Sequence, residues 1–580
     1  MQPIYAGVAG RHPGVIVTAF LDDCTLEGQP TLFRAAYADL TEASATIGLD
    51  VQPHKSRLVY FHQSTHPMEE ALVVAAFLQQ HGIPVHLDSA VLLGAPIYRT
   101  VQAARNSLEA VLVDQRGVLE CLRHCRMPVQ EAIQVLRQST MHRLDCIMRC
   151  VRPEVAEPCV VQYHDAVMTF LFEKLDLISA MGRLGCDHRE ATLLQLHLPI
   201  RQGGVGIPNI TQLYHISYLL SLASTVHRGL SLNVFDRYDS PPSLSATTQL
   251  YRQVQASLHV LCTQAKRLGE DGVELRQLLP ATVEDFFRQC SPHTTTSGRD
   301  LVSLQQALPT YFNHAAGRRL DRLVSASGSA WHGARLAMCR AEGAGRWLTV
   351  VGSDSERILR DDSYRMAVRL RLGLPPMDVM TAHCHSCRAP IMDANAPLLK
   401  QDMWHWLGCT NGVAGAALQQ RHNRVRNVLR DHVLRAKGLA RLEPTNLGDD
   451  NKRPDLLVTF HGKQYILDVA IIHQLAYSHL VRRGSPMVAK QREKIRKYKD
   501  MARQQRMDFV PFIMDTCGGF GPAAVDFLQK LSIHSRDLNG AWSQAEIDGH
   551  LRDTLAVAIQ DGNWRIVHSS YLNAARHRGR

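Results

Sequence analysis

Two hydrophobic runs near the start of the chain predict strands. Residues 14–20 and 56–61 are rich in β-branched and aromatic side chains, which suit a pleated surface. A tight turn containing Asp22 and Asp23 follows the first run, and a helical stretch is predicted from there to about Gly48. We therefore expect a mixed α+β arrangement at the N-terminus.

From about residue 97 to residue 375 the hydrophobic positions follow a helical period. They recur every three or four residues, as one buried helix face requires. The glycine- and proline-containing segment 198–208 interrupts the pattern as a loop, and a polar stretch from Asp239 marks a linker. Further breaks are predicted at 325–329 and around 343–345. The first members of the periodic pattern are Leu108, Val111, Leu112, Leu119 and Leu122.

Two strand-like runs near residue 460 flank His461-Gly462, a pair that favours a two-residue β-hairpin turn. Asp455 and Asp468 lie at equal distances from that turn. In a regular hairpin they would face each other on one side, with Cβ atoms about 5 Å apart. Facing carboxylates repel unless a cation lies between them, and Mg²⁺ suits such a pair. The alternative is an edge hairpin with solvated acids, and a register slip or bulge would separate them.

A basic helical stretch follows this hairpin. Lys490, Lys494 and Lys497 share roughly one face of the predicted helix. A lysine close to the two acids would stabilise the negative charge that develops on a phosphate in a transition state. The alternative is a helix whose basic side chains are merely solvated.

A cysteine–histidine cluster precedes the hairpin with the spacing C-x2-C-x17-H-x3-C. Cys384, Cys387, His405 and Cys409 form a ligand set that predicts a closed tetrahedral zinc site. The neighbouring tryptophans at 404 and 406 are expected to pack around it. A second set is interpreted as core residues rather than as a four-thiolate site: Cys121, Cys125, Cys146 and Cys150.

Composition narrows the class of protein. The chain has 580 residues, too many for one hydrophobic core, so several domains are expected. Its net charge of +11 favours a polyanionic partner. No hydrophobic run approaches the roughly 20 residues that span a bilayer, so no membrane partner is expected. There is no secretory signal pattern, and the 14 cysteines are expected to be reduced intracellular thiols or metal ligands.

The N-terminal motifs resemble the reverse transcriptase of non-long-terminal-repeat retrotransposons. The segment 19–23, with Asp22 and Asp23, resembles the catalytic aspartate turn. Segment 48–56 is similar to the following motif, whose lysine, here Lys55, lies near the incoming nucleotide. Residues 93–97 resemble the primer-gripping turn, and the glycine-rich loop at 203–207 resembles the end of the helical thumb.

The C-terminal motifs resemble the restriction-like endonuclease of the site-specific lineage of these elements. The resemblance lies in the zinc knuckle, Arg421-His422, Arg453-Pro-Asp455 and Asp468. Ala470 replaces a lysine common in the family. The resemblance implies that a helix lysine takes its place, Lys494 by preference and Lys490 otherwise. Expected nucleic-acid contacts are Arg421, His422, Arg424, Lys497 and Tyr498.

The resemblance implies target-primed reverse transcription. Target DNA and element RNA would be the partners, Zn²⁺ and Mg²⁺ the cofactors, and the nucleus the location. Polymerase chemistry needs a further carboxylate on an upstream strand, and only 21 residues precede Asp22. We therefore expect an N-terminally truncated fragment that polymerises nothing but retains a Mg²⁺-dependent DNA endonuclease.

The expected fold is an α+β multidomain chain with five parts. A zinc-stabilised nucleic-acid-binding protein without catalysis is the alternative function, and a plain helical interaction scaffold is a third. Target site and oligomeric state are not indicated. The expected parts are a partial reverse transcriptase palm (1–96), a helical thumb (97–238), a helical linker region (239–378), the zinc knuckle (379–415) and an α/β restriction-like endonuclease domain (416–580).

Overall fold

The computed structural model divides into two compact units. The first comprises residues 1–114 and 146–159, and the second comprises residues 115–145 and 160–580. The chain is mixed α+β and mostly helical, with small sheets. The five finer domains expected from the sequence remain a prediction. The described residues are 2–578 apart from 21–22, 60–66, 87–88, 93–94, 99, 232–248, 291–300, 353, 379, 398–399, 446, 448–451 and 539–542.

The first unit is built around a hairpin. β1 (Val15–Phe20) and β2 (Asp23–Gly28) pair antiparallel along their whole length. The predicted strand at 14–20 is therefore confirmed, whereas the expectation of a helix directly after the turn is wrong, because the chain first returns as a strand that pairs with β1. The other elements are α1 (Gln2–Arg11), α2 (Pro30–Ala45), the parallel pair β3 (Leu58–Val59) and β4 (Val85–His86), α3 (Pro67–His81), and the antiparallel pair β5 (Ser89–Leu92) and β6 (Ala95–Tyr98).

Helices dominate the described chain from residue 101 to residue 372, as the hydrophobic period predicts. The predicted breaks near 325–329 and 343–345 are present. The loop at 198–208 is tied to the interior, since Arg371 donates to the carbonyls of Gly204 (2.8 Å) and Ile200 (2.7 Å). The helices are α4 (Val101–His124), α5 (Val129–Gln138), α6 (Asp145–Cys150), α7 (Pro153–Lys174), α8 (Ile178–Gly182), α9 (Cys186–His197), α10 (Ile210–Ser231), α11 (Gln249–Arg267), α12 (Val273–Leu278), α13 (Val283–Cys290), α14 (Leu301–Ala326), α15 (Ala330–Arg340) and α16 (Asp361–Leu372).

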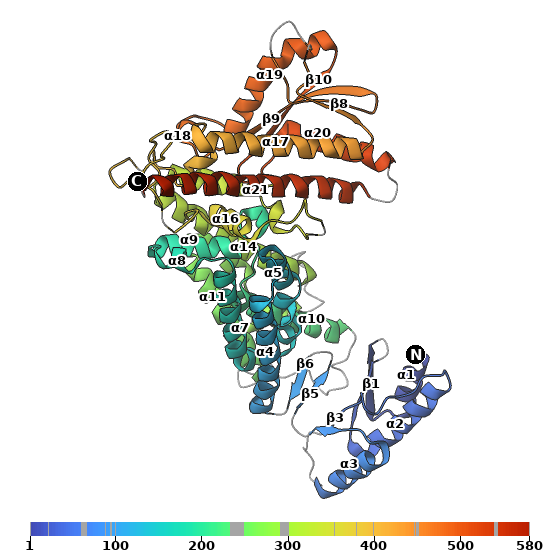
Figure 1. Cartoon of the computed structure of the whole chain (residues 1–580). Coiled ribbons are helices and arrows are strands. Elements are labelled where there is room, and N and C mark those ends of the chain that lie inside the picture. Colours follow the sequence, from blue (N-terminus) through green and yellow to red (C-terminus); the bar gives the residue numbers. More distant parts are fainter. Residues whose placement is uncertain are drawn as a thin grey trace. The chain divides into compact units, whose positions relative to one another are not determined.

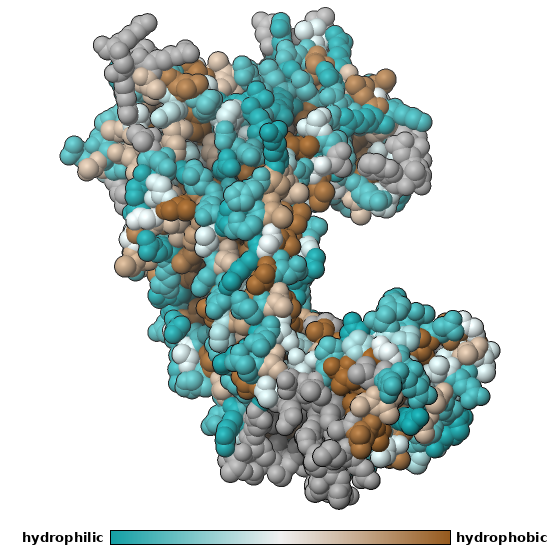
Figure 2. Space-filling model, turned by 60° about the horizontal axis from the view of Figure 1, so that its bottom comes forward, coloured by the Kyte–Doolittle hydropathy of each residue, from teal (hydrophilic) through white to brown (hydrophobic). Residues whose placement is uncertain are grey.

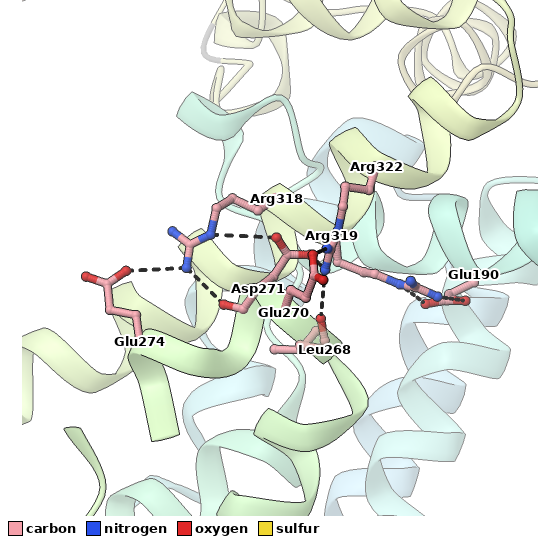
Figure 3. Close-up of polar contacts among 8 residues, drawn as sticks. All are labelled: Glu190, Leu268, Glu270, Asp271, Glu274, Arg318, Arg319 and Arg322. Carbon is pink, nitrogen blue, oxygen red and sulfur yellow. Dashed lines mark hydrogen bonds and ion pairs between the residues drawn. The ribbon is translucent and has the colours of Figure 1, made fainter. Parts of the chain in front are cut away.

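Three arginines of α14 face carboxylates on neighbouring segments (Figure 3). Arg318 donates to the backbone carbonyl of Asp271 at 2.9 Å, and Arg319 donates twice to Glu190 of α9, at 3.0 and 3.3 Å. The positive charge of α14 is therefore neutralised within the fold. The whole group comprises Arg318, Arg319 and Arg322 with Glu190, Glu270, Asp271 and Glu274.

A four-stranded sheet organises the C-terminal region. Its order is β10-β9-β8-β7, with β10 parallel to β9 and the other pairs antiparallel. Helices α17, α20 and α21 pack on one face and α19 packs on the other (Figure 1). The elements are α17 (Gly412–Arg435), β7 (Leu439–Leu442), β8 (Leu456–Phe460), β9 (Lys463–Ile472), α18 (Tyr477–Leu480), α19 (Pro486–Gln505), β10 (Asp508–Asp515), α20 (Pro522–Leu538) and α21 (Gln544–Arg578).

The surface is predominantly polar on the face drawn in Figure 2, where hydrophobic side chains are scattered among hydrophilic ones. Within the described ranges, no helix has the length and hydrophobicity needed to cross a membrane. Helix α19 contributes a row of exposed basic side chains: Arg492, Arg496, Lys497, Lys499 and Arg503.

Candidate active site and metal centre

The β-hairpin predicted around His461-Gly462 is present. β8 and β9 pair in the register that equal spacing from the turn requires, as far as the pair Leu456↔Leu467. Both turn residues have positive φ, 48° for His461 and 67° for Gly462. A type I′ turn needs this conformation at both positions, and glycine adopts it without steric cost. The turn therefore sets the register that brings the two acids to the same end of the hairpin.

Asp455 lies in a bend immediately before β8. Its N–H donates to the Leu467 carbonyl at 3.1 Å, so the regular ladder does not continue to a directly opposed pair with Asp468. Oδ1 of Asp455 lies 2.9 Å from Nε2 of His422, and Oδ2 accepts the Val469 N–H at 2.6 Å. The predicted facing geometry is corrected accordingly: the acids share one end of the hairpin, but the Asp455 carboxylate is held by α17 and by the backbone of β9.

Asp468 is buried on the side of β9 that α19 covers. It is 4% exposed, and the ammonium of Lys494 lies 2.5 Å from its Oδ2. Lys490, one turn earlier on α19, instead pairs with the exposed Glu493 at 2.7 Å. Of the two candidate lysines, the structure therefore places Lys494 beside the acid and Lys490 on the surface. Repulsion between the acids is relieved by a separate protein partner for each.

The remaining residues expected to contact nucleic acid divide between surface and interior. Lys497 is exposed, with its ammonium 4.7 Å from the centre of the Tyr498 ring. Tyr498 itself is fully buried and donates its hydroxyl to a backbone carbonyl at 3.1 Å. Arg421 is 3% exposed, and Arg424 pairs with a carboxylate of α21. Tyr498 and Arg421 are therefore buried while Lys497 is exposed, and the nucleic-acid contacts expected of these residues stay predictions.

The four predicted zinc ligands converge. The donor atoms of Cys384, Cys387, His405 and Cys409 lie within 4.8 Å of one another, and the sulfurs of Cys384 and Cys409 are 3.9 Å apart. Tetrahedral zinc with Zn–S bonds of about 2.3 Å separates two sulfurs by roughly 3.8 Å. The hydrogen bond with Cys409 lowers the pKa of Cys384, although burial opposes this. The cluster can therefore bind a metal such as zinc.

No second cluster of this kind is formed by the described residues. Among the described residues, three or more Cys, His, Asp or Glu donor atoms gather closely at the knuckle alone. The interpretation of the four helical cysteines as core residues is wrong, because Cys121, Cys125 and Cys150 are exposed and Cys146 is only half-buried. The acids of the hairpin likewise do not gather with His422 as tightly as the knuckle ligands do.

The knuckle is packed against the C-terminal region. Trp404 and Trp406 are buried in the same core as the knuckle cysteines, as expected. His473, the residue after β9, lies with Nε2 2.8 Å from Oδ2 of Asp402. The other oxygen of Asp402 accepts the indole N–H of Trp331 at 3.0 Å. These buried bonds tie the knuckle to β9, the strand that carries one of the two acids.

The segments that resemble polymerase motifs are described only in part. Asp22 and the side chain of Asp23 lie outside the described residues, as do residues 93–94 of the expected primer-gripping turn. Lys55 is exposed in a turn, where its N–H donates to the Gln52 carbonyl at 3.1 Å. The roles that the resemblance implies for these residues stay predictions.

Asp515, the last residue of β10, is a buried acid that the sequence did not single out. Oδ1 accepts the N–H groups of Cys517 and Gly519, both at 2.8 Å, and Oδ2 accepts from the Gln474 side chain at 2.9 Å. Burial raises the pKa of Asp515 to about 7, despite these three hydrogen bonds, which lower it. The turn after β10 is therefore built around a carboxyl group that holds its proton unusually tightly.

This pKa predicts a pH-dependent stability. The unfolded aspartate has a pKa of about 3.9, so on raising the pH the unfolded state loses its proton before the folded state does. The contribution of Asp515 to the free energy of unfolding should fall between about pH 4 and pH 7, by up to about 1.4 kcal/mol per pH unit, and level off above. Urea unfolding of the wild type and Asp515→Asn across this range measures the difference. Asp508→Asn, at the exposed start of the same strand, is the control; parallel profiles for wild type and Asp515→Asn would contradict the prediction.

The residues that connect these sites were not predicted from the sequence. The bond between His422 and Asp455 joins α17 to the hairpin, and Asp402 joins the knuckle to β9. The Arg421-His422 motif pointed to the first pair, although as a nucleic-acid contact and not as a partner of an acid. A scan against protein-family models and a search of curated proteins both found no match to this chain.

Proposed function

We propose that the C-terminal region is a metal-dependent DNA endonuclease. The observation that carries the proposal is the buried ion pair between Lys494 and Asp468 at the end of the hairpin that also bears Asp455. Two acids and a lysine are the groups that phosphodiester hydrolysis with a divalent ion requires. Burying such a pair costs desolvation energy, which binding of a cation and a phosphate at the same place would offset.

Asp455 and Asp468 would hold the metal, for which Mg²⁺ is the natural choice. Oδ2 of Asp468 is buried and accepts no hydrogen bond from the described residues, lying next to the Lys494 ammonium instead. A buried carboxylate oxygen that accepts no hydrogen bond is suited to binding a cation. When bound, the ion would polarise the scissile phosphodiester and activate water.

The chain's own residues have separate tasks in this proposal. Lys494 stabilises the negative charge that builds on the phosphate. His422 and the backbone N–H of Val469 fix the orientation of Asp455, acting as positioning groups. The exposed basic side chains of α19 attract the DNA backbone, with an affinity that falls as salt rises.

The biological setting that we propose is a non-long-terminal-repeat retroelement. The zinc knuckle stabilises the region, target DNA and element RNA are the partners, and the nucleus is the location. The N-terminal segments that resemble a reverse transcriptase accompany the nuclease in this setting.

A second function is a zinc-stabilised nucleic-acid-binding protein without catalysis. The observation that favours it is that both acids already have protein partners, Lys494 for Asp468 and His422 for Asp455. In that case the same groups serve as a structural support for a binding surface.

Comparison of two lysine variants tests the nuclease proposal. Lys494→Ala is expected to reduce Mg²⁺-dependent nicking of duplex DNA by about 10²-fold or more, because it removes a charge that stabilises the transition state. Lys490→Ala, its matched control one helical turn away, should keep nearly full activity because Lys490 pairs with a surface glutamate. Thermal unfolding of both variants is measured in parallel, since removing one partner of a buried ion pair also destabilises the fold. Equal nicking rates in two folded variants would remove Lys494 from the site.

A further inference from the structure

A pocket of about 270 Å³ lies between α17 and α21. Half of its lining residues are arginines: Ala417, Gln420, Arg421 and Arg424 come from one face of α17, and Gly562 and Arg565 come from α21. None of the pocket-lining residues is one of the two acids, the candidate lysines or the zinc ligands. The pocket is therefore a feature that the proposed nuclease chemistry does not use.

The charges around this pocket are unbalanced. Asp561 accepts from Arg424, from Arg565 at 2.9 Å and from Arg360 at 2.8 Å. Three guanidinium groups thus share one carboxylate, and Arg421, which lines the same pocket, bonds to Asn563 and a backbone carbonyl instead. In the α14 cluster of Figure 3, by contrast, three arginines meet four carboxylates. The arginines of α14 are neutralised by the fold, whereas those of the pocket leave an excess of positive charge.

Arg421 is a buried charged side chain that lines the pocket. It is 3% exposed; Nη1 donates to Asn563 at 2.7 Å and Nη2 to the Leu407 carbonyl at 3.2 Å, while Nε has no hydrogen-bond partner. Burial lowers the pKa of Arg421 to about 9, so its charge lacks the stabilisation that water or an anion would give. Room for it comes from Gly562, where an added Cβ would lie 2.5 Å from the Arg421 side chain.

We propose that this pocket binds a phosphate group, with Arg421, Arg424 and Arg565 as its donors. Guanidinium groups match the geometry of phosphate oxygens and bind them through paired hydrogen bonds. A phosphate anion in the pocket offsets the excess positive charge and gives the buried Arg421 a counter-charge. The phosphate comes either from a nucleic-acid backbone or from a small free ligand, and the two sources share the same chemistry.

The first test measures the thermal unfolding of the full chain with and without inorganic phosphate, in the absence of divalent ions. Phosphate should raise the Tm of the wild type in a saturable manner, because it binds only the folded state. The increase should be lost in Arg565→Ala and in Arg424→Ala. Arg565 is half-exposed, so its variant leaves two arginines on Asp561 and keeps the fold. The controls are Arg267→Ala and Arg276→Ala, which remove exposed arginines of α11 and α12.

The second arm separates the two sources of phosphate by measuring the binding of a DNA oligonucleotide over a range of salt concentrations. If the pocket holds a backbone phosphate, Arg565→Ala should weaken binding about tenfold and reduce the salt slope by about one. Unchanged oligonucleotide binding together with a lost phosphate effect assigns the pocket to a free phosphate ligand. The proposal is overturned if phosphate shifts all variants equally, or shifts none while oligonucleotide binding is also unchanged. Neither arm needs cleavage, so failure of the nuclease proposal leaves this result intact.

Discussion

Replacement of Asp468 by asparagine is expected to lower the rate of Mg²⁺-dependent DNA nicking by about 10³-fold or more. A divalent ion contributes several kcal/mol of transition-state stabilisation, and about 4 kcal/mol corresponds to that factor. Asparagine is close to aspartate in shape but lacks the charge that holds the ion. The rate is measured on an end-labelled duplex, with DNA binding followed separately so that a loss of chemistry is distinguished from a loss of affinity.

Two further variants make this result specific. Asp455→Asn should give a loss of similar size while leaving the buried ion pair of Asp468 in place. Asp526→Asn removes an exposed carboxylate of α20 that pairs with Lys530 at 2.7 Å, so its nicking rate should stay close to that of the wild type. If Asp468→Asn, Asp455→Asn and Asp526→Asn all nicked DNA at the wild-type rate, the nicking would arise elsewhere in the chain or from a contaminant.

Loss of the zinc site is expected to have the second large effect. Cys387→Ser should abolish the binding of one Zn²⁺ per chain and lower the free energy of unfolding by more than about 4 kcal/mol, since a structural zinc contributes directly to folding. The knuckle shares a core with α15, α17 and α21, so the damage should extend beyond the knuckle itself. Metal content by mass spectrometry and denaturant unfolding measure the two effects.

The matched control is Cys121→Ser, which changes an exposed cysteine outside the knuckle. It should keep both its zinc and its stability. Retention of a full equivalent of zinc by Cys387→Ser, or its loss from Cys121→Ser, would contradict the assignment of the metal to the knuckle.

Local spacing was enough to predict the two short-range features of the C-terminal region. A two-residue turn at His461-Gly462 fixes which residues of the two strands pair. Because Asp455 and Asp468 are equally far from this turn, they lie at the same end of the hairpin. The zinc ligand set follows from cysteine and histidine spacing, because three cysteines and one histidine within a short segment are typical of structural zinc sites. Both depend on neighbours in sequence, and both are present in the structure.

Features that depend on distant segments could not be predicted in this way. The bend that turns the Asp455 carboxylate toward His422 depends on α17, 33 residues earlier in the chain. The burial of Tyr498 follows from its place on the inner face of α19, against Ile466 of β9. The arginine pocket exists only because α21 packs along α17, and a basic residue in a sequence gives no sign of whether a carboxylate elsewhere neutralises it.

The nicking of supercoiled plasmid by the purified full chain tests the central claim most directly. If the hairpin acids form a nuclease site, wild-type protein with Mg²⁺ should convert the plasmid to open circles, chelation should stop the reaction, and Asp468→Asn should leave the plasmid intact. A folded, zinc-loaded wild type that binds the plasmid and never cuts it would contradict the claim and leave a binding protein.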